Sequence, residues 1–408
     1  MSKTIAKEYS VDKIRNITLI GHGGSGKTTL TESLLFVSGT AARMGRVEDG
    51  STISDYHADE IERKISINAA LLHTDWQGTK INILDTPGYS DFTGEVVSSL
   101  HVADLAIVVL KSVEGVEVGS EIVWNNAKNL NIPTMIDINK LDNENADFDR
   151  VVETAKERFG HDVVAAQFPV NQGSAFDSVV DLIKMKLLKF DRDSSGKLSE
   201  NEIPGDLKQK ADQLHEELIE KIAETDEALM NKFFEAGTLD ENDLSIGLRS
   251  ALLQRKIFPI FCSASTTGIG VVPLLNFFVA YAPSPKDRGA VKAISGQEKK
   301  EISLEPNPSK EPSLFVFKTV SEEHVGELSF FRVYTGIITP GLDLQNQTNG
   351  KAERLGQIFV MNGKERQEVA RLVAGDIGAV VKLKDTHTNN TLTGRTLAVD
   401  YPPILFPE

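Results

Sequence analysis

The chain has 408 residues, 40% of them hydrophobic and 25% charged, which is enough apolar material for two or three domains with buried cores. A net charge of −15 argues against a broad nucleic-acid-binding surface and against DNA as a partner, while leaving room for a local basic face that docks on RNA. Residues 1–15 lack the apolar core of a secretory signal, and no apolar run is long enough to span a membrane. Cys262 is the one cysteine and has no partner for an internal disulfide, which fits a reducing compartment. We therefore expect a soluble, cytoplasmic protein without a membrane partner, and we expect it to be a monomer.

Five apolar, β-rich segments alternate with stretches that are compatible with helices. They cover residues 17–20, 81–84, 105–110, 134–138 and 258–261. This alternation predicts an α/β domain with a mainly parallel sheet. Ligands bind such sheets at the carboxyl ends of the strands, so the loops after these segments should converge on one site.

A glycine-rich loop joins the first of these segments to a helix-compatible stretch, residues 28–37. Residues 21–28 read GHGGSGKT, which fits the phosphate-binding pattern G-x-x-x-x-G-K-[ST]. Glycines let backbone N–H groups turn toward an anion at a helix N-terminus, where Lys27 would reach the outer phosphates and Thr28 would offer its hydroxyl to Mg²⁺. A glycine-rich turn before an ordinary helix is the alternative interpretation. The predicted nucleotide-binding residues here are Gly21, His22, Gly23, Gly24, Ser25, Gly26, Lys27, Thr28 and Thr29.

A second motif, D-T-P-G, follows the segment 81–84. In a GTPase the aspartate of such a motif holds Mg²⁺ through water, and the glycine N–H contacts the γ-phosphate. The long polar stretch 39–67 lies between the two motifs, where a nucleotide-sensing switch belongs, and we expect the Ser66 hydroxyl on Mg²⁺. The predicted residues are Asp85, Thr86, Pro87 and Gly88 for the nucleotide, and Thr28, Ser66 and Asp85 for the metal.

A third motif, Asn139-Lys140-Leu141-Asp142, follows the segment 134–138. The Asp142 carboxylate can accept hydrogen bonds from guanine N1–H and its 2-amino group, and adenine offers no equivalent pair. Asn139 would support the loop and guanine N7, and the stem of Lys140 would pack along the base. A polar turn after a strand is the alternative. Ser263 and Ala264, after the segment 258–261, could offer backbone N–H groups to guanine O6, although two small residues are a weak signal.

The remaining chain predicts further domains. The chain between the segments 134–138 and 258–261 is too long for a single crossover connection, so residues from about 162 to 256 indicate an inserted α/β subdomain. Within it, helical spacing of apolar residues predicts an amphipathic helix over 206–223. Residues 289–311 read as linker and loop, which makes 1–288 the first domain. Short alternating strands and turn signals then predict an antiparallel β-barrel domain over 312–402. Residues 403–408 resemble a linker to further domains.

These motifs together resemble the translational GTPases, in particular the front part of the elongation factor G group. Beside the three motifs, the resemblance rests on Glu62-Arg63, Gly115-Val116-Glu117, Tyr281-Ala282-Pro283-Ser284-Pro285 and Arg332-Val333-Tyr334-Thr335-Gly336. It implies GTP and GDP as ligands, Mg²⁺ as cofactor, and the ribosome as partner. In this family the barrel faces ribosomal RNA or protein, and the inserted subdomain faces a stalk protein.

The chain departs from the family pattern at the centre of the predicted site. The family places His after D-T-P-G, where it orients the hydrolytic water, and this chain has Tyr89. A phenol cannot act as an imidazolium, so we expect slow hydrolysis by a divergent paralogue, with Lys27, Gly88 and Tyr89 as the catalytic set. Gly23 and Gly24 replace a bulky aliphatic and an Asp, which puts an auxiliary monovalent-cation site in doubt and leaves room for the larger Tyr89.

Two alternatives to a GTP-hydrolysing translation factor stay open. Tyr89 favours a nucleotide-gated ribosome-binding protein with little intrinsic hydrolysis, whereas Asn139 and Asp142 disfavour an ATP-dependent enzyme. Residues 191–202 also match a calcium-binding EF-hand loop, but Pro204 and Gly205 would break its exit helix, and a polar hairpin tip fits better. The histidines, His22, His57 and His101, show no metal-ligand spacing.

Overall fold

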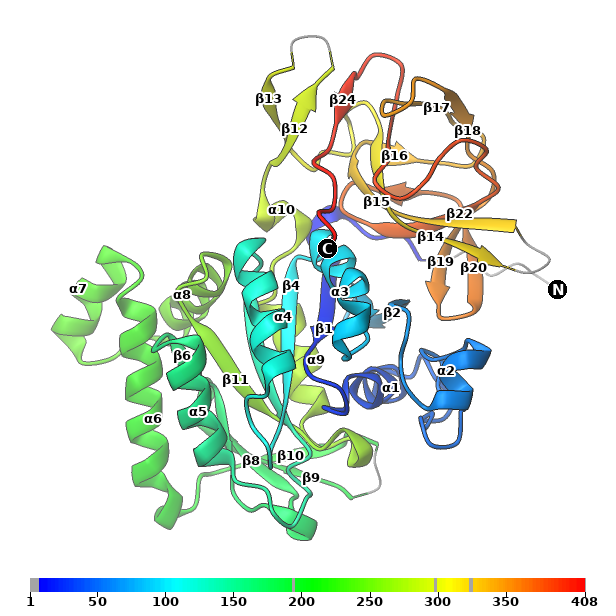
Figure 1. Cartoon of the computed structure of the whole chain (residues 1–408). Helices are drawn as coiled ribbons and strands as arrows, with labels where there is room; N and C mark the ends of the chain where they lie inside the picture. The colour runs from blue at the N-terminus through cyan, green and yellow to red at the C-terminus, as the bar shows by residue number, and fades with distance from the viewer. Residues whose placement is uncertain (1–6, 193–194, 297–298, 323–325, 408) are drawn as a thin grey trace.

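The structure is a computed structural model that describes residues 7–192, 195–296, 299–322 and 326–407 (Figure 1). Its first domain is built on a sheet with the strand order β2-β3-β1-β4-β5-β11-β6, in which β2 is antiparallel to β3 and the other neighbours are parallel. All five predicted strands are confirmed. The strands are β1 (Ile14–Ile20), β2 (Ala70–Trp76), β3 (Thr79–Asp85), β4 (Leu105–Lys111), β5 (Thr134–Asn139), β6 (Val163–Ala165) and β11 (Phe258–Cys262).

Helices cover the sheet, which explains why β1, β3 and β5 are buried along their whole length and why β4 is apolar from Leu105 to Leu110. In the view of Figure 1, α3, α4 and α5 lie in front of the sheet, while α9 lies behind it and packs against α1. Strand β5 is buried along its whole length although it carries Asp137 and Asn139. The helices are α1 (Lys27–Val37), α2 (Ala58–Arg63), α3 (Thr93–His101), α4 (Val118–Asn129), α5 (Phe148–Phe159), α9 (Val271–Ala280) and α10 (Pro285–Arg288).

The predicted insertion forms a small antiparallel sheet, order β10-β9-β8-β7, followed by helices that lie at the left of Figure 1. The amphipathic segment is helix α6, whose Leu218 and Ile222 are buried in the same hydrophobic core as the main sheet. The elements are β7 (Gln167–Pro169), β8 (Ser178–Asp181), β9 (Lys186–Phe190), β10 (Leu198–Asn201), α6 (Gly205–Ala223), α7 (Glu227–Ala236) and α8 (Glu241–Leu253).

The second domain is antiparallel, with the sheet order β18-β17-β23-β14-β15-β22-β19-β20. Among the residues that the structure describes, the pairings end at β18 and β20 and do not close this sheet into a ring. A short pair, β16 (Ile337–Ile338) and β21 (Leu372–Val373), lies beside it. The sheet strands are β14 (Ser313–Glu322), β15 (Gly326–Thr335), β17 (Asp343–Asn346), β18 (Ala352–Arg354), β19 (Ile358–Asn362), β20 (Glu365–Val369), β22 (Ile377–Val381) and β23 (Thr391–Thr393).

The segment 289–311, which the sequence analysis expected to be linker and loop, contains two strands. It contains β12 (Val291–Ser295) and β13 (Glu301–Leu304), which pair with each other, and β12 also pairs with β24 (Val399–Asp400). The pairing partner lies about a hundred residues further along the chain, where no local pattern could reveal it. Within residues 403–407, Ile404 is buried and its N–H donates to Asn389, while the neighbouring Leu405 is exposed.

The two domains share a buried interface. Leu71, Leu84 and Val102 of the first domain pack in one hydrophobic cluster with Phe315 and Phe330 of the second. Two buried ion pairs cross the same interface: Lys80 to Asp376 at 2.7 Å, and Arg332 to Asp104 at 2.9 Å.

A smaller polar junction lies at Ala69, just after the stretch 39–67. Glu95 of α3 accepts a hydrogen bond from the Ala69 N–H at 2.7 Å and from Lys318 of the second domain at 2.6 Å. Lys318 also donates to the Ala69 carbonyl at 2.9 Å. The chain after this stretch, helix α3 and strand β14 therefore meet at one point.

Candidate nucleotide-binding site

The glycine-rich loop runs from the end of β1 to the start of α1 as predicted. Gly26 stands directly before α1 with a φ of 96°, in the left-handed region that favours glycine. A Cβ atom on Gly26 would lie 2.4 Å from Nδ2 of Asn139, so a side chain there would also collide with the last residue of β5. The geometry therefore requires glycine at this position.

Lys27 lies inside the loop. Its Nζ donates to the carbonyls of Gly21 at 2.9 Å and His22 at 3.1 Å. Burial lowers the pKa of Lys27 to about 8, and the nearby carboxylates of Asp85 and Asp55 oppose that shift. A cation with only carbonyl partners in a buried loop suits a phosphate group, which would restore the missing negative charge.

The predicted metal ligands Thr28, Ser66 and Asp85 lie close together, and Asp55, which the sequence analysis did not single out, lies beside them. The hydroxyls of Thr28 and Ser66 are 3.0 Å apart, and the Ser54 hydroxyl donates to Asp85. Asp55, also buried, interacts with Ser66 and with the charge of Asp85. Two hydroxyls and two carboxylates form an oxygen-only set of the kind that Mg²⁺ prefers.

The electrostatics of this cluster fit a divalent cation. One oxygen of Asp85 and one of Asp55 are buried without a hydrogen-bond partner. Burial, followed for Asp55 by repulsion from Asp85, raises the pKa of Asp55 to about 7, and burial raises that of Asp85 to about 6. A bound cation would relieve both penalties because it stabilises the ionised carboxylates.

Two glutamates hold the stretch 39–67 over this cluster. Glu32 of α1 accepts hydrogen bonds from the N–H groups of Gly45, Ile53 and Ser54 at 2.7–3.2 Å. Glu60 of α2 accepts from the N–H groups of Ile67 and Asn68 at 2.9 and 2.8 Å. The first contacts bring Asp55 to Asp85, and the second fix the chain just after Ser66.

Gly88 and Tyr89 follow β3 at the edge of the phosphate loop. A Cβ on Gly88 would lie 2.5 Å from Nζ of Lys27, so the backbone approaches that lysine closely. The Tyr89 ring is half exposed and covers Gly23, whose missing Cβ would stand 3.3 Å from the ring. The Tyr89 ring therefore occupies the space that the absence of a side chain at Gly23 leaves, as the sequence analysis expected.

Asn139, the last residue of β5, ties three loops together. Its Nδ2 donates to the Ser25 carbonyl at 3.1 Å. Its Oδ1 accepts from the N–H groups of Lys140 at 2.8 Å and Ser265 at 3.0 Å. Asn139 therefore supports the phosphate loop from the side of the predicted guanine site.

Two adjoining cavities span the site. One, of about 350 Å³, is lined by Asn139, Asp142 and Thr266, and Asp142 accepts a hydrogen bond from Thr266 at 2.9 Å. The other, of about 210 Å³, is lined by residues of the phosphate loop, by Asp55 and Ser66, and by Tyr89. They share Gly26, Thr29 and Lys140, and Lys140 takes a left-handed backbone conformation, with a φ of 64°.

Comparison with known proteins identifies these parts. Residues 12–193 match the elongation factor Tu GTP binding domain, and residues 311–395 match elongation factor G domain 2. A crystal structure of a protein from Thermus thermophilus has a TM-score of 0.84 and 29% sequence identity to this chain, with 97% of this chain and 56% of that one covered. The chain thus spans about half the length of that protein.

The chain belongs to the translational GTPases of the elongation factor G type. Its first domain is therefore a guanine-nucleotide-binding domain, and the P-loop fold with a following antiparallel domain is confirmed. None of the helices that the structure describes is long and apolar enough to cross a membrane.

One predicted contact of this GTPase differs in the structure. Ser263 and Ala264 are fully buried, and their N–H groups already donate to the carbonyls of Ile138 and Ile269, both at 3.0 Å. Their neighbours Ser265 and Thr266 line the larger cavity instead. A contact of this loop with guanine therefore stays a prediction, and the backbone hydrogen bonds of Ser263 and Ala264 could not be read from two small side chains.

Other predicted features lie away from the nucleotide site. The EF-hand-like stretch 191–202 includes Asp193 and Ser194, which lie outside the described residues, and its Glu202 pairs with Lys186. Among the residues that the structure describes, no group of three or more His, Cys, Asp or Glu side chains could hold a metal ion. Burial raises the pKa of the Cys262 thiol well above its usual range, so Cys262 stays a neutral core residue.

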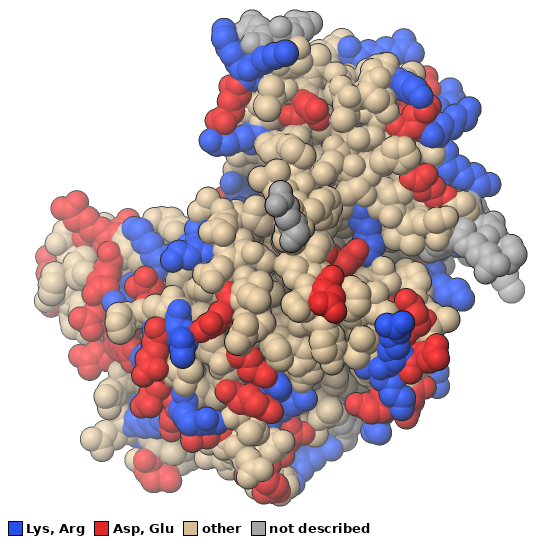
Figure 2. All heavy atoms as spheres, viewed as in Figure 1, with Lys and Arg blue, Asp and Glu red and all other residues tan. Residues whose placement is uncertain are grey.

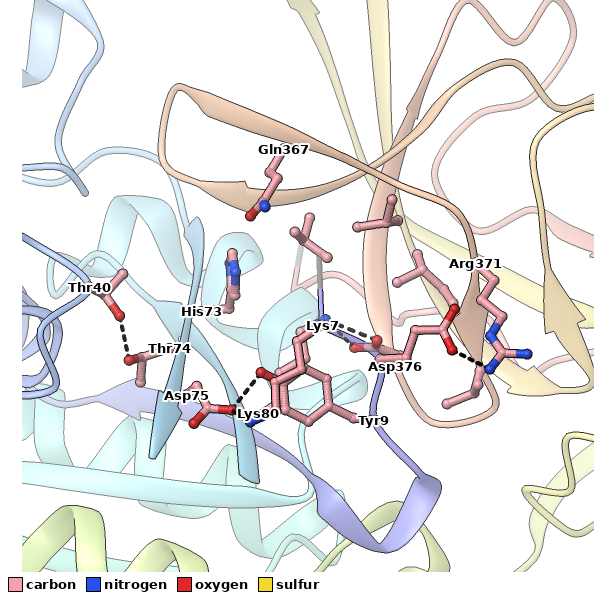
Figure 3. A pocket seen from close by; sticks show the side chains of 15 residues that line it. Lys7, Tyr9, Thr40, His73, Thr74, Asp75, Lys80, Gln367, Arg371 and Asp376 are labelled. Atoms are coloured by element: carbon pink, nitrogen blue, oxygen red, sulfur yellow. Dashed lines mark hydrogen bonds and ion pairs between the residues drawn. The ribbon is translucent and has the colours of Figure 1, made fainter. Parts of the chain in front are cut away.

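A separate cavity of about 300 Å³ lies between the domains, beside β2 and β20 (Figure 3). Its charged side chains face one another: Lys7 pairs with Asp75 at 2.7 Å, Lys80 pairs with Asp376, and Arg371 pairs with Glu8. Tyr9 also donates to Asp75 at 2.6 Å. Because these charges are matched, the cavity resembles a polar seam of the interface rather than a ligand site.

Proposed function

We propose that this elongation factor G-type GTPase binds GTP with Mg²⁺ and hydrolyses it to GDP and phosphate while it acts on the ribosome. The observation that carries the proposal is the pair of cavities that share Gly26, Thr29 and Lys140. One cavity has the carboxylate that suits guanine, and the other has the cation and the oxygen ligands that suit a triphosphate and its metal. A single nucleotide would occupy both.

Each residue then has a distinct task. Lys27 would exchange its loop carbonyls for oxygens of the outer phosphates, and Thr28, Ser66 and Asp85 would hold Mg²⁺, with Asp55 beside them. When bound, the metal would neutralise charge on the phosphates. The Gly88 N–H would face the terminal phosphate. Hydrolysis in this class depends mainly on such positioning and charge stabilisation.

Tyr89 is the reason to expect slow GTP hydrolysis. Its ring covers Gly23 at the mouth of the phosphate cavity, where a hydrolytic water would enter. A phenol cannot deliver the positive charge of an imidazolium, so hydrolysis should be slow. This observation also favours the second candidate, a nucleotide-gated ribosome-binding protein that barely hydrolyses GTP.

The test is single-turnover GTP hydrolysis with and without purified ribosomes, for the wild type, Tyr89→His and Tyr89→Ala. Slow wild-type turnover that His accelerates supports a site tuned toward binding. Fast stimulated turnover that Ala abolishes would show instead that Tyr89 positions the water, and would contradict slow hydrolysis. Competition of ATP against GTP in the same assay tests the nucleotide class, and equal competition by ATP would contradict selectivity for guanine.

The ribosome enters the proposal through the family alone. The second domain would face ribosomal RNA or protein, and the inserted subdomain would face a stalk protein. Figure 2 shows acidic side chains gathered over α6 and α7, so a partner at the subdomain would need a basic face. Cytoplasmic location and a monomeric state are proposed on the same basis.

A further inference from the structure

Strand β5 carries a carboxylate that the proposed mechanism does not use. Asp137 is fully buried, and the residues paired with it across the sheet are the apolar Val109 and Phe261. Its Oδ2 lies 2.7 Å from the Ser263 hydroxyl, while its Oδ1 is buried without any hydrogen-bond partner. No cation pairs with Asp137 in the part of the chain that the structure describes.

An ionised carboxylate is a poor fit for this position. A buried charge needs a counter-ion or several donors, and removing it from water otherwise costs several kcal/mol. Asp137 has one donor at most. Burial accordingly raises the pKa of Asp137 to about 7, and the hydrogen bond from Ser263 opposes that rise. The neutral acid, by contrast, needs only one acceptor for its own O–H.

The Ser263 hydroxyl lies between Asp137 and the nucleotide site. Its Oγ is 2.7 Å from Oδ2 of Asp137 and 3.2 Å from Oδ1 of Asn139. The single hydroxyl proton can be donated to only one of them. An ionised Asp137 would take that proton, while a neutral Asp137 would donate to Ser263 and free the Ser263 proton for Asn139.

We propose that Asp137 is a positioning residue that, as a neutral carboxylic acid, orients Asn139 through the Ser263 hydroxyl and so strengthens guanine-nucleotide binding. The hydrogen bonds then run in one direction, from Asp137 to Ser263, from Ser263 to Asn139, and from Asn139 Nδ2 to the Ser25 carbonyl of the phosphate loop. Such chains reinforce one another in a low-dielectric core. The inference rests on the proposed nucleotide site and adds proton dependence to it.

The described surroundings offer Asp137 no competing titration partner. Cys262 on the neighbouring strand β11 is a neutral thiol, and Lys210 of α6 and Asp149 of α5, whose charges act on Cys262, pair with each other. Lys27 in the phosphate loop donates to backbone carbonyls. Loss of the Asp137 proton would therefore be felt mainly at Ser263 and Asn139.

The sign of the effect is fixed by this arrangement. The neutral acid supports Asn139, so affinity should be full at pH 6 and should fall as the pH rises through about 7. The expected loss is that of one hydrogen bond, or about fivefold in Kd. By linkage, nucleotide binding would in turn raise the pKa of Asp137.

The experiment measures the Kd of fluorescent GDP from pH 6 to pH 8.5 for the wild type and Asp137→Asn. The amide of Asn can donate to Ser263 at every pH, so the ratio of wild-type to variant Kd should rise about fivefold across this range, free of the titration of GDP itself. Thr134→Val, a buried and nearly isosteric change on the same strand, should keep the wild-type profile. A ratio that is flat or falls with pH would overturn the proposal.

A second variant and a second readout remove the remaining ambiguity. Ser263→Ala interrupts the chain but leaves Asp137 in place, and it should weaken GDP binding at pH 6 and abolish the pH dependence even if Asp137→Asn folds poorly. The infrared band of a protonated carboxyl should appear in the wild-type minus Asp137→Asn difference at pH 6 without nucleotide. Absence of that band contradicts the inference alone, whereas absence of any GDP binding contradicts the proposed function alone.

Discussion

At the scale of single residues, the proposed selection of guanine would depend on one side chain, Asp142. Asp142 lines the larger cavity, and the Thr266 hydroxyl holds one of its oxygens at 2.9 Å. The orientation of the carboxylate is thus fixed before a base arrives. Fixed acceptors select strongly, because a base without matching donors leaves the charge unpaired.

Asp142→Asn should weaken GDP binding roughly a hundredfold, since two charge-assisted hydrogen bonds are lost. It should improve binding of xanthosine diphosphate, whose 2-oxo group accepts a hydrogen bond from the new amide. Titration calorimetry with both nucleotides measures this exchange. Asp212→Asn, an exposed change on α6, is the matched control and should alter neither Kd. Equal loss for both nucleotides would contradict a direct contact with the base.

The sequence predicted the residues whose spacing is imposed by phosphate and base chemistry, such as Lys27, Asp85 and Asp142, and the structure brings them together. Their roles in binding stay predictions. Asp55 and Asp137 escaped prediction for different reasons. Asp55 becomes buried only because Glu32 of α1 ties the neighbouring Ile53 and Ser54 to the helix, and Asp137 is a polar residue inside a run that reads as an ordinary buried strand.

At the scale of elements, the stretch 39–67 is anchored at two places by glutamate side chains. Its short helix α2 begins with a capping box, and the buried Glu60 in its first turn binds the N–H groups of Ile67 and Asn68. Glu32 supplies the corresponding contacts at the other end.

Glu60→Ala should free the amides of Ile67 and Asn68, because the variant leaves them without an acceptor. Their hydrogen exchange should accelerate about tenfold, in line with the loss of about 1–3 kcal/mol for unsatisfied buried donors. Hydrogen-exchange mass spectrometry of peptides that cover residues 53–68 measures the effect. Glu62→Ala, on the exposed side of α2, serves as control. Faster exchange throughout the sheet would point to general destabilisation and contradict a local role.

Elements were predictable where the pattern is local. The parallel strands and helix α6 followed from apolar runs and helical spacing, whereas β12, which pairs with β13 and also with β24 far along the chain, lies in a stretch that reads as linker. The same limit applies to the domain boundaries, and the division near residues 288 and 312 stays a prediction.

At the scale of the whole molecule, the domains are joined by a buried interface that is both apolar and charged. Lys80 and Asp376 are 2% and 5% exposed, and Asn82 also donates to Asp376 at 3.0 Å. Removing one partner of a buried ion pair is costly because the other charge stays in the interface.

Lys80→Met should lower the free energy of unfolding by about 3–5 kcal/mol, because Asp376 loses its counter-ion in a buried site. Lys292→Met removes the exposed pair with Glu301 and should change it by less than about 1 kcal/mol. Urea unfolding of both variants measures the difference. Similar shifts in the two variants would mean that the interface pair contributes no more than a surface pair.

The junction of Ala69, Glu95 and Lys318 joins the chain after residues 39–67, the helix α3 and the strand β14. The two domains would be coupled at this point if a bound nucleotide moved Ala69 or Glu95. If a nucleotide that shifts Ala69 or Glu95 changes the affinity of β14 for a partner, that partner must change the affinity of the nucleotide site by the same factor. A partner bound to the second domain would then distinguish the nucleotide-bound form and would also alter the lifetime of the bound nucleotide.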